Sequence, residues 1–480
     1  MRAANSANLI DVQALRVGMF VHLDVGWMSH PFPLSSFKIT SPQQVATIRS
    51  LGLKRVRWNP QQSDPATSPG GLEAPDEAPA TNAASPSGSA GEDGAFATVD
   101  GAPAGAANKA AVEEEAATVA GADSAPAAAA TAPGGAPSGQ APVSGLEAPM
   151  PRAERRRIAE GQREALQLCE RQFSEAARDC RHVTDLVPVK PQEARGQAEL
   201  LTHALLDKML GTQEVCIRLL TEAAGDKASM HALNVMLVSL LMGRSFGFTE
   251  ADLLDIGVGA MLHDIGKIGM PFRLRHPDET FTPGEHRDYE EHVAHGLALA
   301  RRMGLTPGAT LVIAQHHEHA DGSGFPLKLA SDRMTIAARI VAIVNRYDNL
   351  CNPLFLAKAL TPHESLSLLF AQGKAKYDTS ILGAFIRMMG VYPPGSTVQL
   401  TDDRYAMVVS VNSTRPLKPS VLVHEVGVPR DEALVIDLEK ADGVGIRRSI
   451  KPGQLPPASF EYLSPRQRVA YFFEPVERRS

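Results

Sequence analysis

The alternation of apolar and polar residues divides the chain into helical and β-rich regions. Between residues 195 and 390, apolar residues recur at the spacing i, i+3, i+4, which predicts amphipathic helices. The clearest of these are expected at 231–242, 252–262, 291–303, 335–350 and 381–389. After residue 395 the pattern changes to short apolar runs separated by turn residues. It predicts strands at 397–400, 405–411, 420–426 and 433–437.

The first 60 residues predict a small α+β unit. Short apolar runs at 17–21 and 56–58 are typical of strands. Between them, Ser41 can cap a helix and Pro42 suits its first position, so we expect a helix over 41–50. A second, charged helix is expected over 151–185, where Arg, Glu, Gln and Ala dominate. This helix could form a dimer seam, although it lacks sustained heptads.

The composition of residues 61–150 sets them apart from the rest of the chain. Ala, Pro, Gly and Ser account for 59 of these 90 residues, and Phe96 is their only aromatic residue. Such a segment cannot bury enough apolar surface to offset the entropy of ordering it, so we expect a long disordered linker. The segment carries a net charge of −11, which leaves +5 on the other residues.

These patterns divide the chain into five parts. In order, they are a small α+β unit (1–60), a disordered linker (61–150), a charged connecting helix (151–195), a helical domain (196–395) and a β-rich C-terminal extension (396–480). The predicted fold class is therefore mainly α, a helical bundle flanked by two smaller units. A chain of 480 residues can build such cores without disulfide bonds.

Charge, cysteine content and hydropathy exclude several classes of protein. The 48 basic and 54 acidic side chains give a net charge of −6, which argues against a DNA or RNA binder of the histone type. The four cysteines form no C-x-x-C pair, which argues against a disulfide scaffold or thiolate zinc site and fits a reducing cytoplasm. The sequence shows no secretory signal and no run of about 18 apolar residues, so we expect a cytoplasmic chain without a membrane span.

Histidines cluster in the helical region, where nine of the 15 lie between residues 231 and 319. Imidazole is the commonest side-chain metal ligand, and His263 is followed by Asp264, whose carboxylate can bridge two cations. His231 and His292 lie on two other predicted helices, and the pair at 316–317 follows an apolar run at 311–314. Four helices could therefore bring these groups to one dinuclear metal site.

The order and spacing of these residues resemble the HD-GYP family, cyclic di-GMP phosphodiesterases within the HD superfamily of metal-dependent phosphohydrolases. The likeness covers about residues 225–395. It rests on His231, the string HDIGK at 263–267, His292 four residues before Gly296, and the string HHEHADGSGFP at 316–326. Residues 15–58 are similar to a small domain of unknown function that precedes some HD-GYP domains. The pattern at 15–21, with Trp27 and Phe37, carries that second likeness.

The resemblance implies an HD-type helical bundle that holds two divalent metal ions, usually iron or manganese. One metal would take His231, His263 and Asp264, and the other would take Asp264, His292, His316 and His317. The family's last metal ligand would fall at Asn345. Asp264 and Lys267 would act in catalysis, with the lysine stabilising charge on the phosphoryl oxygens. The substrate would be cyclic di-GMP or a related nucleotide, opened to pGpG and/or GMP. It would be bordered by His319, Asp321, Gly322, Gly324, Phe325 and Pro326.

Four residues depart from the family's pattern. Asn345 stands where the last ligand is normally Asp, and its amide oxygen can coordinate a cation but brings no charge. Asp348, one helical turn further on, could substitute for it or cap a neighbour. His319 replaces an Arg suited to phosphate, and Phe325 replaces a Tyr but keeps the ring. Lys227 stands where trinuclear members place a Glu, which argues against a third metal.

Three functions therefore remain open. The first is a metal-dependent cyclic di-GMP phosphodiesterase in bacterial second-messenger signalling. The second is a catalytically weak or inactive module that senses the nucleotide or binds a partner, which Asn345 and His319 suggest. The third is an HD phosphohydrolase that acts on another nucleotide. A homodimer or a signalling protein partner is compatible with each.

Overall fold

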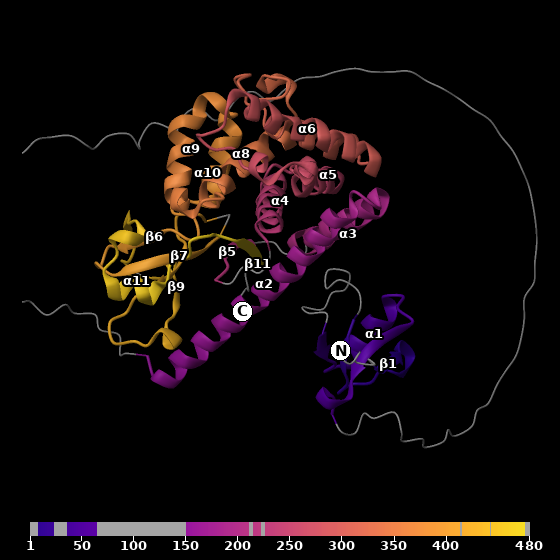
Figure 1. Ribbon diagram of the computed structural model, residues 1–480. Coiled ribbons are helices and arrows are strands. Elements are labelled where there is room, and N and C mark those ends of the chain that lie inside the picture. Colours follow the sequence, from indigo (N-terminus) through magenta and orange to yellow (C-terminus); the bar gives the residue numbers. More distant parts are fainter. Residues whose placement is uncertain are drawn as a thin grey trace, which may run out of the picture. The chain divides into compact units, whose positions relative to one another are not determined.

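The computed structural model describes residues 8–23, 36–64, 150–210, 215–221, 226–412, 415–441 and 443–475 (Figure 1). Trp27 and nearly all of the predicted linker at 61–150 lie outside these residues. Among the helices of the described ranges, none is both long and apolar enough to cross a membrane.

The N-terminal unit is a four-stranded antiparallel sheet with one helix. Its strands are β1 (Asn8–Asp11), β2 (Phe20–His22), β3 (Ser36–Lys38) and β4 (Arg55–Asn59), in the order β1-β4-β2-β3. The helix α1 (Pro42–Ser50) is capped by Ser41, whose side chain accepts a hydrogen bond from the Gln44 amide. Val21, Ile48 and Val56 form part of its separate core. The predicted α+β unit is thus confirmed, although β1 and β3 were not foreseen.

The central part of the chain is a helical body. Its helices are α2 (Arg152–Leu186), α3 (Pro191–Leu210), α4 (Lys227–Ser245), α5 (Glu250–Leu262), α6 (Pro283–Met303), α7 (Pro307–Gln315), α8 (Ile336–Cys351), α9 (Pro362–Lys376) and α10 (Thr379–Met389). Helix α4 is apolar almost all round and packs against α2, α5 and α8, so it lies at the centre of the body. The mainly α fold class predicted from the sequence is confirmed.

The C-terminal part forms a second antiparallel sheet that is not built from the C-terminal residues alone. Its main path runs β10 (Ile446–Ser449), β6 (Thr397–Leu400), β7 (Tyr405–Asn412), β5 (Val215–Leu219) and β11 (Tyr471–Pro475). Strand β8 (Ser420–Val423) pairs with β7 and with β9 (Val435–Asp437). The sequence analysis did not predict β5, β10 or β11, nor the short helix α11 (Pro457–Leu463). Because β5 lies between α3 and α4 in the sequence, this sheet joins a strand from within the helical part of the chain to the C-terminal strands.

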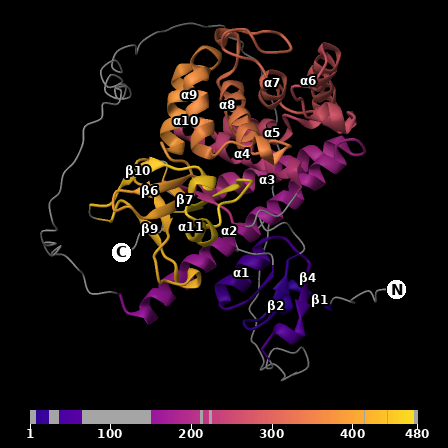
Figure 2. The same ribbon diagram turned by 60° about the vertical axis from the view of Figure 1, so that its left-hand side comes forward.

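The long helix α2 connects the sheet to the helical body (Figures 1 and 2). At its start, Arg152 and Arg156 form ion pairs with Glu432, and Gln162 exchanges hydrogen bonds with the backbone of Val435. Further along, the ring of Phe173 packs edge-on against Phe472 of β11. These contacts hold the β-rich part and the helices in one packed arrangement.

Candidate metal centre

Six of the seven predicted metal ligands converge from four helices. Two of them lie within α4 and α6, and the others directly follow the last residues of α5 and α7. They form two groups whose ligand atoms lie within 4.8 Å of one another. One group is His231, His263 and Asp264, and the other is Asp264, His292, His316 and His317. The two groups share Asp264, as a bridging ligand must.

The Asp264 carboxylate turns one oxygen to each group. Its Oδ2 lies 3.8 Å from Nε2 of His231 and 3.6 Å from Nε2 of His263. Its Oδ1 lies 3.6 Å from Nε2 of both His292 and His316. In the described part of the chain, this buried Oδ1 has no hydrogen-bond partner. A buried carboxylate oxygen without a donor indicates a position prepared for a cation.

Backbone carbonyls fix the protonation of three of the imidazoles. A carbonyl oxygen only accepts, so each ring must carry its proton on Nδ1 and keep a lone pair on Nε2. The Nδ1 atoms donate to carbonyls three residues earlier, His263 to Ala260 at 2.7 Å, His292 to Tyr289 at 2.5 Å and His316 to Ile313 at 2.8 Å.

The Nε2 lone pairs then face one another at short distances. Nε2 of His231 lies 3.2 Å from that of His263, and Nε2 of His292 lies 3.3 Å from that of His316. Burial lowers the pKa of His263 well below its usual value and that of His292 to about 3, so a shared proton is disfavoured. Facing acceptors of this kind fit a cation between them. The residues present therefore fit two divalent cations bridged by Asp264.

Lys267 supplies a permanent positive charge beside the bridge. Its Nζ donates to Oδ2 of Asp264 at 2.8 Å and lies 5.1 Å from the centre of the Tyr289 ring. Burial alone would lower the pKa of Lys267, but the Asp264 carboxylate raises it above its usual value. Burial likewise would raise the pKa of Asp264, but Lys267 and His263 hold it well below its usual range. Both groups are charged at neutral pH.

Gly266 lets the turn after α5 lie directly against α6. This turn, the 3-10 helix η5 (Ile265–Gly269), contacts α6 beside His292. A Cβ atom on Gly266 would stand 1.9 Å from the carbonyl oxygen of His292 and 2.5 Å from the amide nitrogen of Gly296. The glycine of the HDIGK string is therefore a packing requirement of the metal centre.

Asp348 orients His231 instead of standing free to bind a metal. Its Oδ2 accepts a hydrogen bond from Nδ1 of His231 at 2.6 Å. Its Oδ1 accepts from Nδ2 of Asn234 at 2.7 Å and from Nδ2 of Asn352 at 2.9 Å. Both carboxylate oxygens of this buried side chain are thus engaged. Of the two roles left open for Asp348, the geometry favours holding a neighbour, here a candidate ligand.

The same two asparagines connect the centre to the C-terminal sheet. Nδ2 of Asn234 and Nδ2 of Asn352 both donate to the carbonyl of Val469, at 3.0 and 2.9 Å. The Val469 amide donates to Oδ1 of Asn352, and the Tyr471 amide donates to Oδ1 of Asn234. The sequence analysis missed this network because most of its hydrogen bonds join residues more than 100 positions apart.

Asn345 lies in α8 one turn before Asp348 and is buried. Its Oδ1 accepts a hydrogen bond from Nδ2 of Asn349 at 2.6 Å. A metal bond to this oxygen would have to share or replace that hydrogen bond. The ligand role of Asn345 therefore stays a prediction.

The loop that follows the paired histidines is held by a buried acid. Glu318 is fully buried and accepts hydrogen bonds from the amides of Leu327 at 2.6 Å and Leu329 at 2.8 Å. Gly324 packs so closely that an added Cβ would come 2.4 Å from the His319 amide nitrogen. The Phe325 ring then stacks on His317, with ring centres 4.4 Å apart, and precedes Pro326 through a cis peptide bond.

The predicted substrate-side residues share this loop but differ in exposure. His319 is part-buried and its Nδ1 lies 3.0 Å from Oγ of Ser323, while exposed Asp321 accepts a hydrogen bond from the Ser323 amide. Gly322 adopts a φ of 76°, which favours glycine. Burial lowers the pKa of His319, so its ring is neutral at pH 7 and offers no charge in place of an Arg.

Tyr289 is a site residue that the sequence analysis did not single out. It lies on α6 one turn before His292, and its hydroxyl is 3.3 Å from Nε2 of His317. Its ring also packs edge-on against Phe325, with centres 6.0 Å apart. The helical spacing of Tyr289 and His292 was the available signal, but tyrosine at such a position is more often an ordinary core residue.

The fold and the site define a helical metal-site protein of the HD type, and comparisons with known proteins agree. Residues 214–381 match the family model of the HD domain, and residues 8–197 match a domain of unknown function, DUF3391. The predicted resemblance is thereby confirmed. Residues 214–381 thus form an HD domain, and the chain is similar to HD-GYP proteins that carry an N-terminal DUF3391 domain.

Most of the curated relatives that match are named as cyclic di-GMP phosphodiesterases, and two from Vibrio cholerae are named as 3'3'-cGAMP-specific phosphodiesterases. One from Pseudomonas aeruginosa is 25% identical over 218 residues, a match that covers 44% of this chain and 52% of the relative. One from Thermotoga maritima is 30% identical over 181 residues, covering 36% of this chain and 47% of the relative. The chain thus spans about half the length of the curated relatives it matches. Among solved structures, an HDG"Y"P protein from Bdellovibrio bacteriovorus aligns with a TM-score of 0.37 at 18% identity, over 48% of this chain and 76% of that one.

Proposed function

We propose that the chain is a metal-dependent phosphodiesterase that hydrolyses cyclic di-GMP to pGpG and/or GMP. The observation that supports this most strongly is the pair of ligand groups that share Asp264, with the Lys267 ammonium 2.8 Å from the shared carboxylate. Most of the curated relatives are named as cyclic di-GMP phosphodiesterases, which supports this choice of substrate over the 3'3'-cGAMP of two others.

In this proposal the site residues have separate roles in metal binding, phosphate binding and orientation of a ligand. Two divalent cations, iron or manganese, would be held by His231, His263, Asp264, His292, His316, His317 and Asn345, and when bound would supply Lewis acidity and an activated water. Lys267 binds and neutralises a phosphoryl oxygen, because it is charged and lies beside the bridge. Asp348 keeps the proton of His231 on Nδ1, so that Nε2 faces the cation position.

The loop at 318–329 would border the nucleotide. Glu318 holds its backbone, and Phe325 supplies an aromatic face beside His317 on which a base can stack. Asp321, Gly322 and Gly324 shape the rim, and Pro326 follows the ring. The neutral His319 can donate or accept one hydrogen bond but adds no charge.

The test is hydrolysis by the full chain loaded anaerobically with iron or manganese. We expect cyclic di-GMP to be converted to pGpG and/or GMP, and Asp264→Asn to lose most of this activity. The variant Asp332→Asn, which changes an exposed residue, is the matched control and should keep the hydrolytic activity. Failure of the parent to turn over cyclic di-GMP, with both metals shown to be bound, would refute the proposal. Hydrolysis of a panel of other phosphodiesters, measured in the same assay, ranks the substrates by kcat/KM.

A second candidate function is a nucleotide-sensing module with weak or no catalysis. The hydrogen bond between Asn345 and Asn349 favours it, since it occupies the oxygen expected to bind a metal. The test is the double variant Asn345→Asp with His319→Arg, which should gain a hydrolytic activity absent from the parent. Activity in the parent would contradict this candidate.

A further inference from the structure

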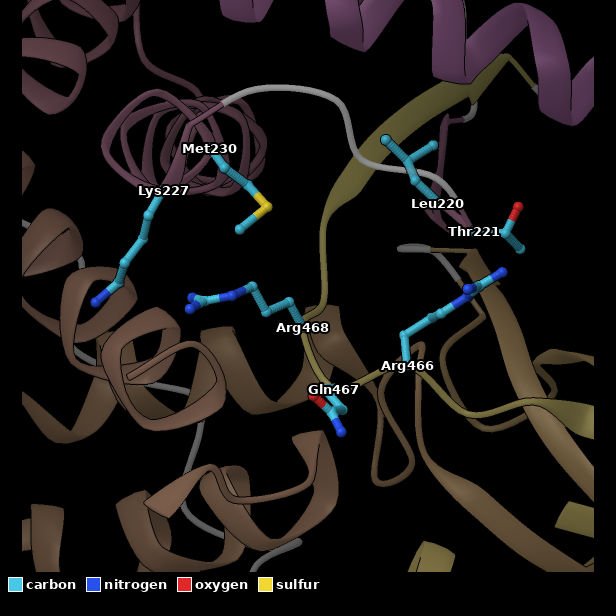
Figure 3. A pocket seen from close by; sticks show the side chains of 7 residues that line it. All are labelled: Leu220, Thr221, Lys227, Met230, Arg466, Gln467 and Arg468. Atoms are coloured by element: carbon cyan, nitrogen blue, oxygen red, sulfur yellow. The ribbon is translucent and has the colours of Figure 1, made fainter. Parts of the chain in front are cut away.

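A cavity of about 420 Å³ lies beside the start of α4. It is lined on one side by the end of β5 and the first turn of α4, and on the other by the segment that leads into β11 (Figure 3). Its lining residues are Leu220, Thr221, Lys227, Met230, Arg466, Gln467 and Arg468. Two segments that are about 240 residues apart in sequence therefore build one cavity.

The charges that line this cavity are all positive. Lys227 and Arg468 point toward one another from opposite walls, while Arg466 points toward Thr221 (Figure 3). Within the described ranges, none of these three cations makes an ion pair with a carboxylate. Arg468 makes one long hydrogen bond, from Nη1 to the carbonyl of Pro353 at 3.4 Å. Partly buried cations that face one another favour an anion between them.

The pKa of Lys227 is consistent with an anion bound between the two cations. Burial and, after it, the neighbouring positive charge of Arg468 lower the pKa of Lys227 to about 8. The carboxylates of Asp348 and Asp264 act in the opposite direction but do not restore the usual pKa. A bound anion would relieve the repulsion between the two cations.

The cavity lies next to the metal centre. Lys227 precedes His231 by four residues on α4, which is about 6 Å along the helix axis at a rise of 1.5 Å per residue. The segment with Arg466 and Arg468 is fixed at the following residue, Val469, whose backbone bonds to Asn234 and Asn352. Those asparagines hold Asp348, which holds His231. The C-terminal segment is therefore tied to a metal ligand through hydrogen bonds.

We propose that this cavity binds the phosphate of the nucleotide that is not being cleaved, with Lys227 and Arg468 as its main contacts. The inference rests on the proposed function and extends it. A cyclic dinucleotide carries two phosphodiester anions, and the metal centre with Lys267 accounts for one of them. The second phosphate would meet the paired cations of this cavity, Lys227 and Arg468. In this account a segment beyond the matched HD domain completes the substrate site.

The first test uses inorganic phosphate with the full-length, metal-free chain in a calorimetric titration. We expect the parent to bind phosphate. The variants Lys227→Gln and Arg468→Gln should each weaken that binding about tenfold. Arg468→Lys keeps the charge and should keep most of the affinity. The matched control, Arg387→Gln, removes an exposed arginine of α10 that does not line the cavity and should change nothing. Absence of phosphate binding, or equal binding by all variants, would overturn the assignment, whether or not the chain hydrolyses cyclic di-GMP.

The second test separates the subsite from the metal centre. With cyclic di-GMP as substrate, Arg468→Gln should raise KM about tenfold and change kcat little. With bis(p-nitrophenyl) phosphate, which carries a single phosphate, kcat/KM should be unchanged. Equal losses on both substrates would show that the variant disturbs the metal centre and would overturn the proposal. A parent inactive on both would refute the proposed function, and the phosphate titration would still decide the subsite.

Discussion

Gly266 shows how a single residue sets the geometry of the centre. The HDIGK string was recognised as part of a metal motif, but the need for its glycine follows only from the contact with α6. No pattern within the string shows which helix passes next to it. Sequence could therefore indicate that the glycine matters but not which atoms it makes room for.

Replacing Gly266 by Ala should disrupt this contact. The new Cβ would stand 1.9 Å from the His292 carbonyl oxygen, so η5 or α6 must move. We expect the free energy of unfolding to fall by about 1–3 kcal/mol and bound metal to be lost. Chemical denaturation and metal analysis check both effects. Gly269→Ala is the control, because no heavy atom lies within 4 Å of its added Cβ. If the two variants behave alike, the packing role of Gly266 is wrong.

Asp348 gives a second prediction at the residue scale. Asp348→Asn removes the charge that holds the Nδ1 proton of His231 while leaving every candidate ligand in place. We expect metal affinity to fall about 10- to 100-fold. Competition with a metal-sensitive dye measures this, with exposed Asp332→Asn as the control. An unchanged affinity would argue that Asp348 merely packs between helices.

The elements that carry the ligands were largely predictable. Apolar periodicity placed α4, α5, α6, α8 and α10 within a few residues of their observed bounds, except that α6 begins eight residues before its predicted start. The charged first turns of α6 hid its helical period, although Thr282 and Glu285 form a capping box there. Strand β5 was missed because five apolar-rich residues between two helices give no distinctive period.

The loop at 318–329 allows a prediction at the scale of an element. Glu318→Gln removes the carboxylate that accepts from the amides of Leu327 and Leu329, and a Gln can replace only one acceptor oxygen. We expect faster hydrogen exchange at both amides and a higher KM for the nucleotide. Exposed Glu291→Gln on α6 is the control. Unchanged exchange at these amides would show that Glu318 does not hold the loop.

At the scale of the whole molecule, the C-terminal sheet is connected to the candidate metal centre by hydrogen bonds. Strand β11 pairs with β5 and places Val469 where Asn234 and Asn352 bind it. The β-rich C-terminal part was predicted from the sequence, but its dependence on β5 and its link to Asp348 were not. Such long-range pairings are set by tertiary packing, which local patterns do not encode.

Replacing the side chain of Asn352 should break the link between the C-terminal sheet and Asp348. Asn352→Ala leaves the backbone groups of Val469 without one of their partners and removes a donor from Asp348. We expect the free energy of unfolding to fall by about 1–3 kcal/mol and metal affinity to fall with it. Denaturation followed by metal titration measures the two together. Loss of stability with metal affinity intact would show that the sheet supports the fold but not the centre.

The most direct test of the account is the metal content of the full chain purified anaerobically with iron or manganese supplied. Facing imidazole lone pairs and an orphaned Asp264 oxygen predict two divalent ions per chain. His263→Ala and His292→Ala should each lower that content, because each removes a ligand from one group. A chain that retains no metal under these conditions, while folded, would contradict the account.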